Sequence, residues 1–132
     1  MELLAVVCIL GVISAFGLVS FKPLWQKNTL QTAARELESR MQFLRMRAIL
    51  ENSTIEMKIS GHYLVYRKKE GTAWWDWKKH RLDDRIQYRI AGSIYFDQKG
   101  FTTPKTITLN LNQLTQKIII NINGRIRTSE II

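Results

Sequence analysis

The sequence has 132 residues, of which 45% are apolar and 23% charged, and its formal net charge is +9. This length and composition indicate one globular domain, with or without an appendage, and exclude a disordered chain. All 20 Lys and Arg residues, and all but one of the 11 Asp and Glu residues, lie from Lys22 onward, so that part has a net charge of +10. Such a charge indicates contact with a polyanion (nucleic acid, anionic lipid or an acidic wall polymer) or simply a soluble basic surface.

Residues 3–21 form an uncharged apolar run, LLAVVCILGVISAFGLVSF. As a helix rising roughly 1.5 Å per residue, this run spans about 28 Å, close to the hydrocarbon core of a bilayer. It lacks the basic start and the cleavage site of a secretory signal peptide, so we expect a retained membrane helix rather than a removed segment or a buried core helix. Cys8, the single cysteine, cannot form a disulfide within the chain and is expected to act as a small apolar side chain.

Glu2 lies at the edge of this run, where a carboxylate either stays among lipid headgroups or faces a positive partner in an assembly. The stretch ELLAVVCILGVI, from Glu2 to Ile13, resembles the start of mature type IV pilins and pseudopilins. This resemblance implies that Glu2 pairs with the N-terminal amine of a neighbouring subunit during filament assembly. Family precursors carry a short basic leader and a few residues before the glutamate, whereas only Met1 precedes it here, so leader processing is not readable from this sequence.

After Lys22 the pattern becomes amphipathic. Pro23 should kink or restart the helix. Apolar residues then recur at three- and four-residue spacing, which predicts an amphipathic helix over residues 24–50. These apolar positions are Leu30, Ala33, Leu37, Met41, Leu44 and Ala48. The N-terminal part is therefore expected to be one long, bent helix.

From residue 54 to residue 128, apolar and polar residues alternate as in half-buried strands. The strands are expected near residues 55–59, 63–67, 86–90, 94–96, 107–111 and 118–122, with turns at residues 61–62 and within 112–116. Residues 68–84 are the least regular. We expect an α+β fold in which the long helix packs on an antiparallel sheet of about six strands. Residues 1–21 would form the transmembrane and filament-core helix, and residues 22–132 the globular domain.

The second half of the chain resembles the GspH/FimT-type minor pseudopilins, a group that includes the competence protein ComGD. Two segments carry this resemblance: IYFDQKG at Ile94–Gly100 and GRIR at Gly124–Arg127. It implies a pilin-like fold whose partners are other pilin or pseudopilin subunits, with the assembly ATPase and platform protein contacted only indirectly. It also implies a single-pass protein of the inner membrane with an extracytoplasmic domain, although the basic residues after the anchor weakly favour the opposite orientation.

Catalytic and metal-binding motifs are missing from the sequence. His62 and His80 lie in expected turns, with no Cys, Asp or Glu at metal-ligand spacing. The acidic pair at residues 83–84 lies between Arg81 and Arg85, which predicts surface ion pairs. We therefore expect no cofactor, no metal and no enzymatic activity.

Two groups of residues are candidates for binding nucleic acid. In an extended strand, Arg125 and Arg127 project to one side about 6–7 Å apart, like successive phosphates. They resemble the Gly-Arg-x-Arg signature of DNA-binding FimT-type minor pilins, and Lys117 is a further candidate on the same hairpin. The alternative is a charged edge that discourages aggregation.

The second group comprises Trp74, Trp75 and Trp77, which alternate with lysines. Such residues can stack bases and neutralise phosphates. They can also form a subunit interface, cover the core or enter lipid headgroups. We favour an interface or the core.

Taken together, these patterns favour a minor pseudopilin of a competence filament for DNA uptake, with a structural role. A first rival is a minor pseudopilin of type II secretion, whose partner would be an exported protein. A second rival is a membrane-tethered basic module that binds wall polymers or lipid and never polymerises.

Overall fold

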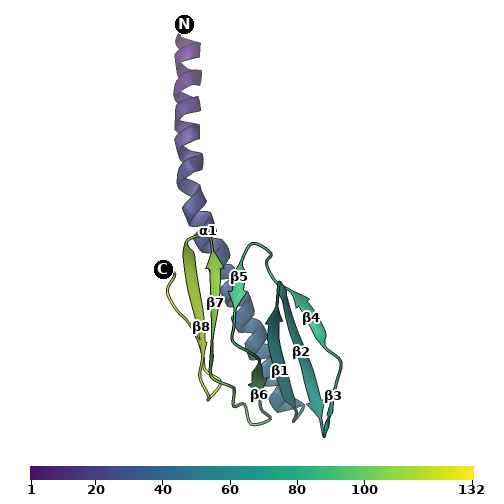
Figure 1. Ribbon diagram of the computed structural model, residues 1–132. Helices are drawn as coiled ribbons and strands as arrows, with labels where there is room; N and C mark the ends of the chain where they lie inside the picture. Colours follow the sequence, from purple (N-terminus) through teal and green to yellow (C-terminus); the bar gives the residue numbers. More distant parts are fainter.

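In the computed structural model, one helix carries the N-terminal part of the chain, and two antiparallel sheets pack against its second half (Figure 1). The structure describes the backbone of residues 1–132 and the side chains of all residues except 18–20. The elements are α1 (Glu2–Leu50), β1 (Thr54–Ser60), β2 (Tyr63–Glu70), β3 (Ala73–Trp74), β4 (Lys78–Arg81), β5 (Gln87–Arg89), β6 (Ile94–Phe96), β7 (Lys105–Leu111), β8 (Leu114–Ile120) and β9 (Ile126–Thr128).

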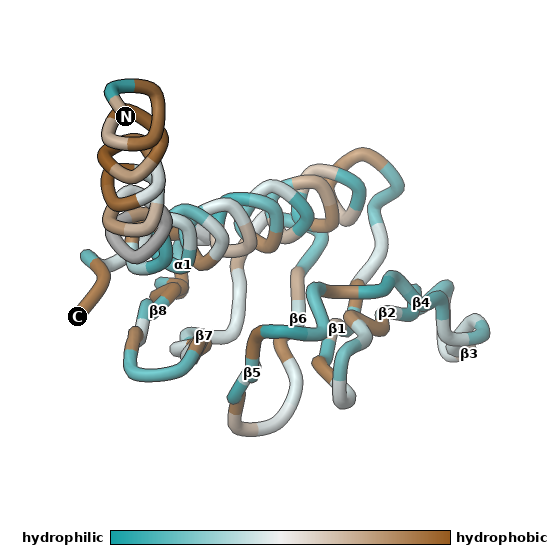
Figure 2. The backbone as a smooth tube through the Cα atoms, turned by 90° about the horizontal axis from the view of Figure 1, so that it is seen from above, coloured by the Kyte–Doolittle hydropathy of each residue, from teal (hydrophilic) through white to brown (hydrophobic). Residues whose placement is uncertain are grey.

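The surface of α1 changes along its length, from apolar on all sides to apolar on one side (Figure 2). Every large apolar side chain between Leu3 and Ile13 is more than half exposed. From Leu30 onward, the side that faces the sheets is buried, and Leu37 and Met41 are fully enclosed. The expected amphipathic pattern is therefore present, and it marks the part of α1 that belongs to the domain core.

Pro23 lies inside α1 and does not end it. The helix changes direction between its apolar and amphipathic parts (Figure 1). This agrees with the expected long, bent helix. Proline has no N–H to donate, and its ring crowds the preceding turn, so a proline within a continuing helix produces a bend. The bend directs the amphipathic part across both sheets.

The strands form two sheets rather than the single sheet of about six strands expected from the sequence. The first sheet has the order β3-β2-β1-β6, with β4 also paired to β2, and the second has the order β5-β7-β8-β9. The additional strands are β3, β4 and β9. None of them contains two apolar residues that alternate with polar ones, so the sequence carries no strand signal there. Both β3 and β4 lie in the stretch that we expected to be irregular.

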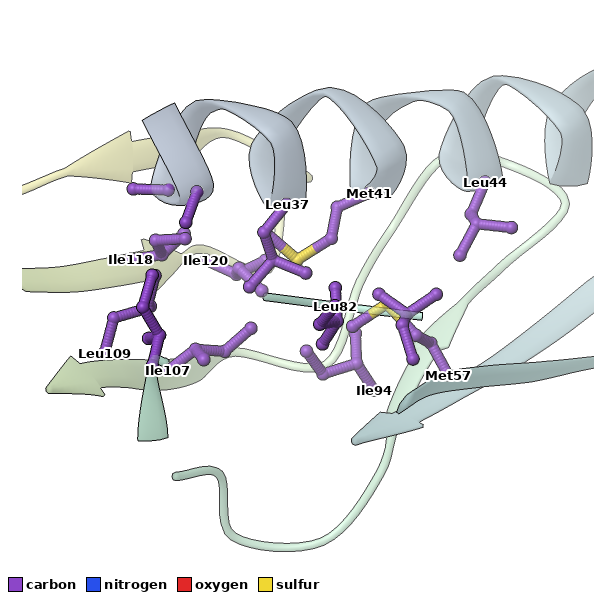
Figure 3. Packing of buried hydrophobic residues seen from close by; sticks show 14 of the residues in the cluster. Leu37, Met41, Leu44, Met57, Leu82, Ile94, Ile107, Leu109, Ile118 and Ile120 are labelled. Atoms are coloured by element: carbon purple, nitrogen blue, oxygen red, sulfur yellow. The ribbon is translucent and has the colours of Figure 1, made fainter. Parts of the chain in front are cut away.

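The core lies between α1 and the inner faces of both sheets (Figure 3). Leu37 and Met41 meet side chains of the second sheet, and Leu44 lies over the first. The strand residues that face them in this view are Met57, Ile94, Ile107, Leu109, Ile118 and Ile120. Each such side chain stabilises the fold by roughly 1.5–3 kcal/mol when fully buried, so the helix and sheets form one unit.

The outer face of the first sheet holds a buried carboxylate, that of Glu56 in β1, which is 6% exposed. Arg67 Nε donates to Glu56 Oε2 at 2.7 Å, and the Tyr95 hydroxyl donates to Oε1 at 3.3 Å. Burial alone would raise the pKa of Glu56, but hydrogen bonds with Arg67, Ser93 and Tyr95 outweigh it and hold the pKa below its usual range. This face is therefore held by a charged network.

Replacing Glu56 by Gln should lower the free energy of unfolding at pH 7 by about 2 kcal/mol, because Arg67 loses its charged acceptor. The pKa of Glu56 is lower in the folded chain than in the unfolded chain. Its contribution to the free energy of unfolding is therefore fully present above the unfolded pKa and is lost as the pH falls through the folded pKa. The two proteins should therefore converge in stability below about pH 4.

Thermal unfolding of the full chain in detergent across pH measures this difference. Ser60→Ala, at an exposed position of the same strand, is the control and should change little. Equal stability of the native chain and Glu56→Gln at neutral pH would contradict the network.

Candidate functional site

The side of the second sheet that faces away from α1 carries basic side chains. Lys117 is exposed between two buried residues of β8, so it points away from the core. Arg127 lies opposite Ile119, and residues directly opposite each other share a face, so Arg127 is on the same outer side. Lys117 and Arg127 are thus diagonal neighbours about 7–8 Å apart. The carbonyl of Arg125 accepts a hydrogen bond from the Asn121 N–H at 3.0 Å, which continues the ladder beyond β9.

Arg89 joins this surface and was not among the predicted site residues. Thr108 of β7 pairs with both Arg89 of β5 and Lys117 of β8, so all three share the outer side. Two strand spacings place Arg89 about 10 Å from Lys117. The alternation of residues 86–90 indicates that Arg89 points outward, but only the strand pairing places it on the same face as Lys117. We call Arg89, Lys117, Arg125 and Arg127 the basic face.

Within the described part of the chain, none of the four basic-face side chains has a carboxylate partner. β5, β7, β8 and β9 contain no Asp or Glu. Ion pairs elsewhere engage Arg40, Arg47, Arg67, Lys68, Arg81 and Arg85. The basic face therefore presents four unpaired cations on one side of a sheet whose strands carry no carboxylate, an arrangement suited to a polyanion.

The turn before Arg125 is held by α1. Arg45 Nε donates to the carbonyl of Gly100 at 2.9 Å, and Arg45 Nη2 donates to that of Asn123 at 3.2 Å. Gly124 has a φ of 77°, and a Cβ there would lie 2.2 Å from Arg45 Nε. Only glycine tolerates this backbone conformation and close approach. The two segments that carry the family resemblance are therefore fastened together by one helix side chain.

The three tryptophans do not form one site. The Arg67 guanidinium lies 4.3 Å from the ring centre of Trp74 and 4.5 Å from that of Trp77, and Lys58 Nζ lies 4.4 Å from the Trp77 ring. These two half-buried rings cover the outer face of the first sheet through cation–π contacts. Trp75, in contrast, is 60% exposed and available to a partner.

The sequence predicted a turn at His80, and this was wrong: His80 lies in β4, where its Nε2 is 3.2 Å from Glu36 Oε1. His62 lies in the predicted turn. The ion pairs expected around residues 83–84 are present. Among the described side chains, no group of three or more His, Cys, Asp or Glu could hold a metal ion.

Glu2 lies in the first turn of α1, where the helix dipole favours an acidic group. Its side chain is exposed and makes no ion pair within the described residues. The apolar part of α1 that follows is long and apolar enough to cross a membrane, by length and composition, and none of its described side chains is buried inside the chain. Glu2 and the exposed apolar side chains from Leu3 to Ile13 can therefore contact groups outside this chain.

Comparisons with known proteins agree with this architecture. The family model of the type II transport protein GspH matches residues 33–124. No curated protein matches the sequence significantly. The minor pseudopilin EpsH from the type 2 secretion system of Vibrio cholerae is similar in structure, with a TM-score of 0.65 and 17% identity over 76% of this chain and 95% of that chain. The type IV minor pilin FimU of Pseudomonas aeruginosa is also similar in structure, with a TM-score of 0.66 and 20% identity over 82% of this chain and 93% of that chain.

At these identities the two solved structures show the fold alone, a long helix packed on antiparallel sheet. The predicted α+β, pilin-like fold and the resemblance to GspH/FimT-type minor pseudopilins are therefore confirmed. The family match extends over more than half of the 132 residues. The chain belongs to the type II transport protein GspH family.

Proposed function

We propose that this chain is a minor pseudopilin of a type IV pilus-like filament for DNA uptake, and that the basic face contacts the phosphate backbone of DNA. Before assembly, residues 3–21 hold the subunit in the inner membrane with its domain on the extracytoplasmic side. The same helix then enters the filament core, where Glu2 pairs with a neighbouring subunit. The role is structural, and the chain does no catalysis.

The observation that supports the DNA contact is the unpaired positive charge of the basic face. Arg and Lys side chains contact phosphate oxygens directly, and small polar side chains add further hydrogen bonds. The remaining outward residues of β5 and β7 are such polar residues: Gln87, Thr106, Thr108 and Asn110. None of these side chains is aromatic, so the face suits backbone contacts rather than base stacking.

A minor pseudopilin of type II secretion is the second candidate, and the description of the matching family and the likeness to EpsH favour it. The likeness to FimU, a type IV minor pilin, has nearly the same TM-score, so the fold does not separate a secretion filament from a type IV pilus-like one. In a secretion filament the partner would be an exported protein, and salt-sensitive DNA binding would be absent. DNA binding therefore discriminates between the candidates.

Arg125→Ala/Arg127→Ala should weaken DNA binding, and the slope of log K against log salt should become shallower by about 2, because two phosphate contacts are lost. Fluorescence anisotropy of a labelled duplex with the full chain in zwitterionic nanodiscs, across a salt series, measures both quantities.

Lys78→Ala/Lys79→Ala is the matched control, since it removes the same charge from exposed residues of β4 in the first sheet. Binding that falls equally in both double variants would mean that only net charge matters. Absence of binding by the native chain at low salt would refute the DNA role and favour secretion.

Glu2→Ala should abolish incorporation into filaments while leaving membrane insertion intact, because the carboxylate is needed only for pairing with a neighbour. Immunoblots of membranes and of sheared filaments measure the two steps separately. Glu130→Ala, at an exposed residue near the C-terminus, is the control and should incorporate normally. Unchanged incorporation of Glu2→Ala would refute the pairing, and absence of the native chain from filaments would favour a simple membrane tether.

A further inference from the structure

A cavity of about 210 Å³ opens beside Trp75, between the end of α1 and β2. Its lining includes Ile55, which is 1% exposed, and Tyr66, which packs against the core. The exposed ring of Trp75 forms part of the wall. This volume corresponds to roughly seven waters at ~30 Å³ each, below the ~300 Å³ of the smallest drug-sized pockets. It is the size for one large side chain.

The ring of Trp75 is held in place although it is exposed. Its Nε1–H donates to Glu70 Oε2 at 3.0 Å, and its backbone N–H donates to the Lys68 carbonyl at 2.8 Å. The neighbouring Trp74 and Trp77 fasten the same segment to the sheet through cation–π contacts. An aromatic ring positioned before binding loses little freedom on contact, as is typical of the residues that dominate interfaces.

Most cations around the cavity are paired with carboxylates, unlike those of the basic face. Glu51 accepts from Arg47 and from Lys68, each at 2.8 Å, and Lys68 also lies 2.9 Å from Glu70. Hydrogen bonding to Lys68 is the main cause that lowers the pKa of both Glu51 and Glu70, so both carboxylates are ionised at neutral pH. A polyanion would meet these negative charges here, whereas a protein surface would not be disfavoured in this way.

Exposed apolar side chains continue the surface along α1. Phe43 and Leu50, which are 60% and 77% exposed, lie four residues before and three residues after Arg47. Residues at these spacings are neighbours on a helix surface. Because Arg47 lines the cavity, these two apolar side chains flank it on the helix, and the ion pairs described above add charge at its edge, the usual anatomy of a protein interface.

We propose that this surface docks a different pilin-like subunit, which inserts one apolar side chain into the cavity beside Trp75. Another copy of this chain is disfavoured, because the net charge of +10 from Lys22 onward repels an identical domain. The partner surface is instead neutral or acidic, and its carboxylates meet Lys78, the cavity cation that has no ion pair among the described residues. This inference rests on the proposed filament role and not on the proposed DNA contact.

The test is photo-crosslinking in cells, with p-benzoylphenylalanine at Leu50 of the full chain. The expected product is an adduct with a different chain that begins with a pilin-type apolar helix, identified by peptide mass. Trp75→Ala should lower its yield about tenfold, the loss of one anchor contact, and Trp75→Phe should largely retain it. The same probe at Thr106, on the outer side of the second sheet, should not give this adduct.

The proposal would be overturned by adducts with DNA or lipid, by adducts between two copies of this chain, or by the absence of any subunit adduct. An adduct yield that Trp75→Ala does not change would also overturn it. Thermal unfolding of each variant checks that a lower yield does not come from a loss of folding. Trp75→Ala should leave the unfolding midpoint unchanged, whereas Trp74→Ala, which loses the Arg67 contact, should lower it. The native chain is followed in sheared filaments at the same time. Its absence there would refute the filament role, whereas its presence without the adduct would refute only the docking surface.

Discussion

The structure depends on one constraint: a single helix of 49 residues whose two parts must bury their apolar side chains in different places. The second part buries one face against two sheets, and this contact forms the core. The first part has apolar residues on all sides, and none of its described side chains is buried within the chain. Because leaving each large apolar side chain in water costs roughly 1.5–3 kcal/mol, this part requires lipid or neighbouring helices. A membrane-held subunit that later joins a bundle of helices meets this requirement in both states.

The same helix also organises the surfaces of the domain. Arg45 fastens the turn that precedes Arg125 and so fixes one end of the basic face. Two residues later, on another side of the helix, Arg47 lines the cavity beside Trp75. The two surfaces differ in charge: unpaired cations on the second sheet suit a polyanion, and balanced pairs around the cavity suit a protein. This separation fits the proposed role, in which one surface contacts DNA and the other a neighbouring subunit.

The sequence predicted the long helix, its change from apolar to amphipathic, and six of the strands, because apolar residues recur with a regular period in and beside these elements. It did not predict β3, β4 or β9, since Lys78–Arg81, for example, contains no apolar residue that could alternate. The sequence also did not predict the separate roles of the tryptophans, because Trp74 and Trp77 are distinguished from Trp75 by burial and by their contacts with Arg67 in the folded chain. Arg89 was missed because its place on the basic face depends on strand pairing far along the chain.

The most direct test of the central claim is the accessibility of Cys8, the single cysteine, which lies exposed within the apolar part of α1. A water-soluble maleimide would be applied to membrane vesicles and to sheared filaments, beside a Cys8→Ser/Thr106→Cys variant that places the thiol on the outer side of the second sheet. If lipid and then neighbouring helices bury this part, Cys8 should react far more slowly than the thiol at position 106 in both samples, and equally fast after denaturation. Equal reaction rates in intact vesicles or in filaments would contradict the account.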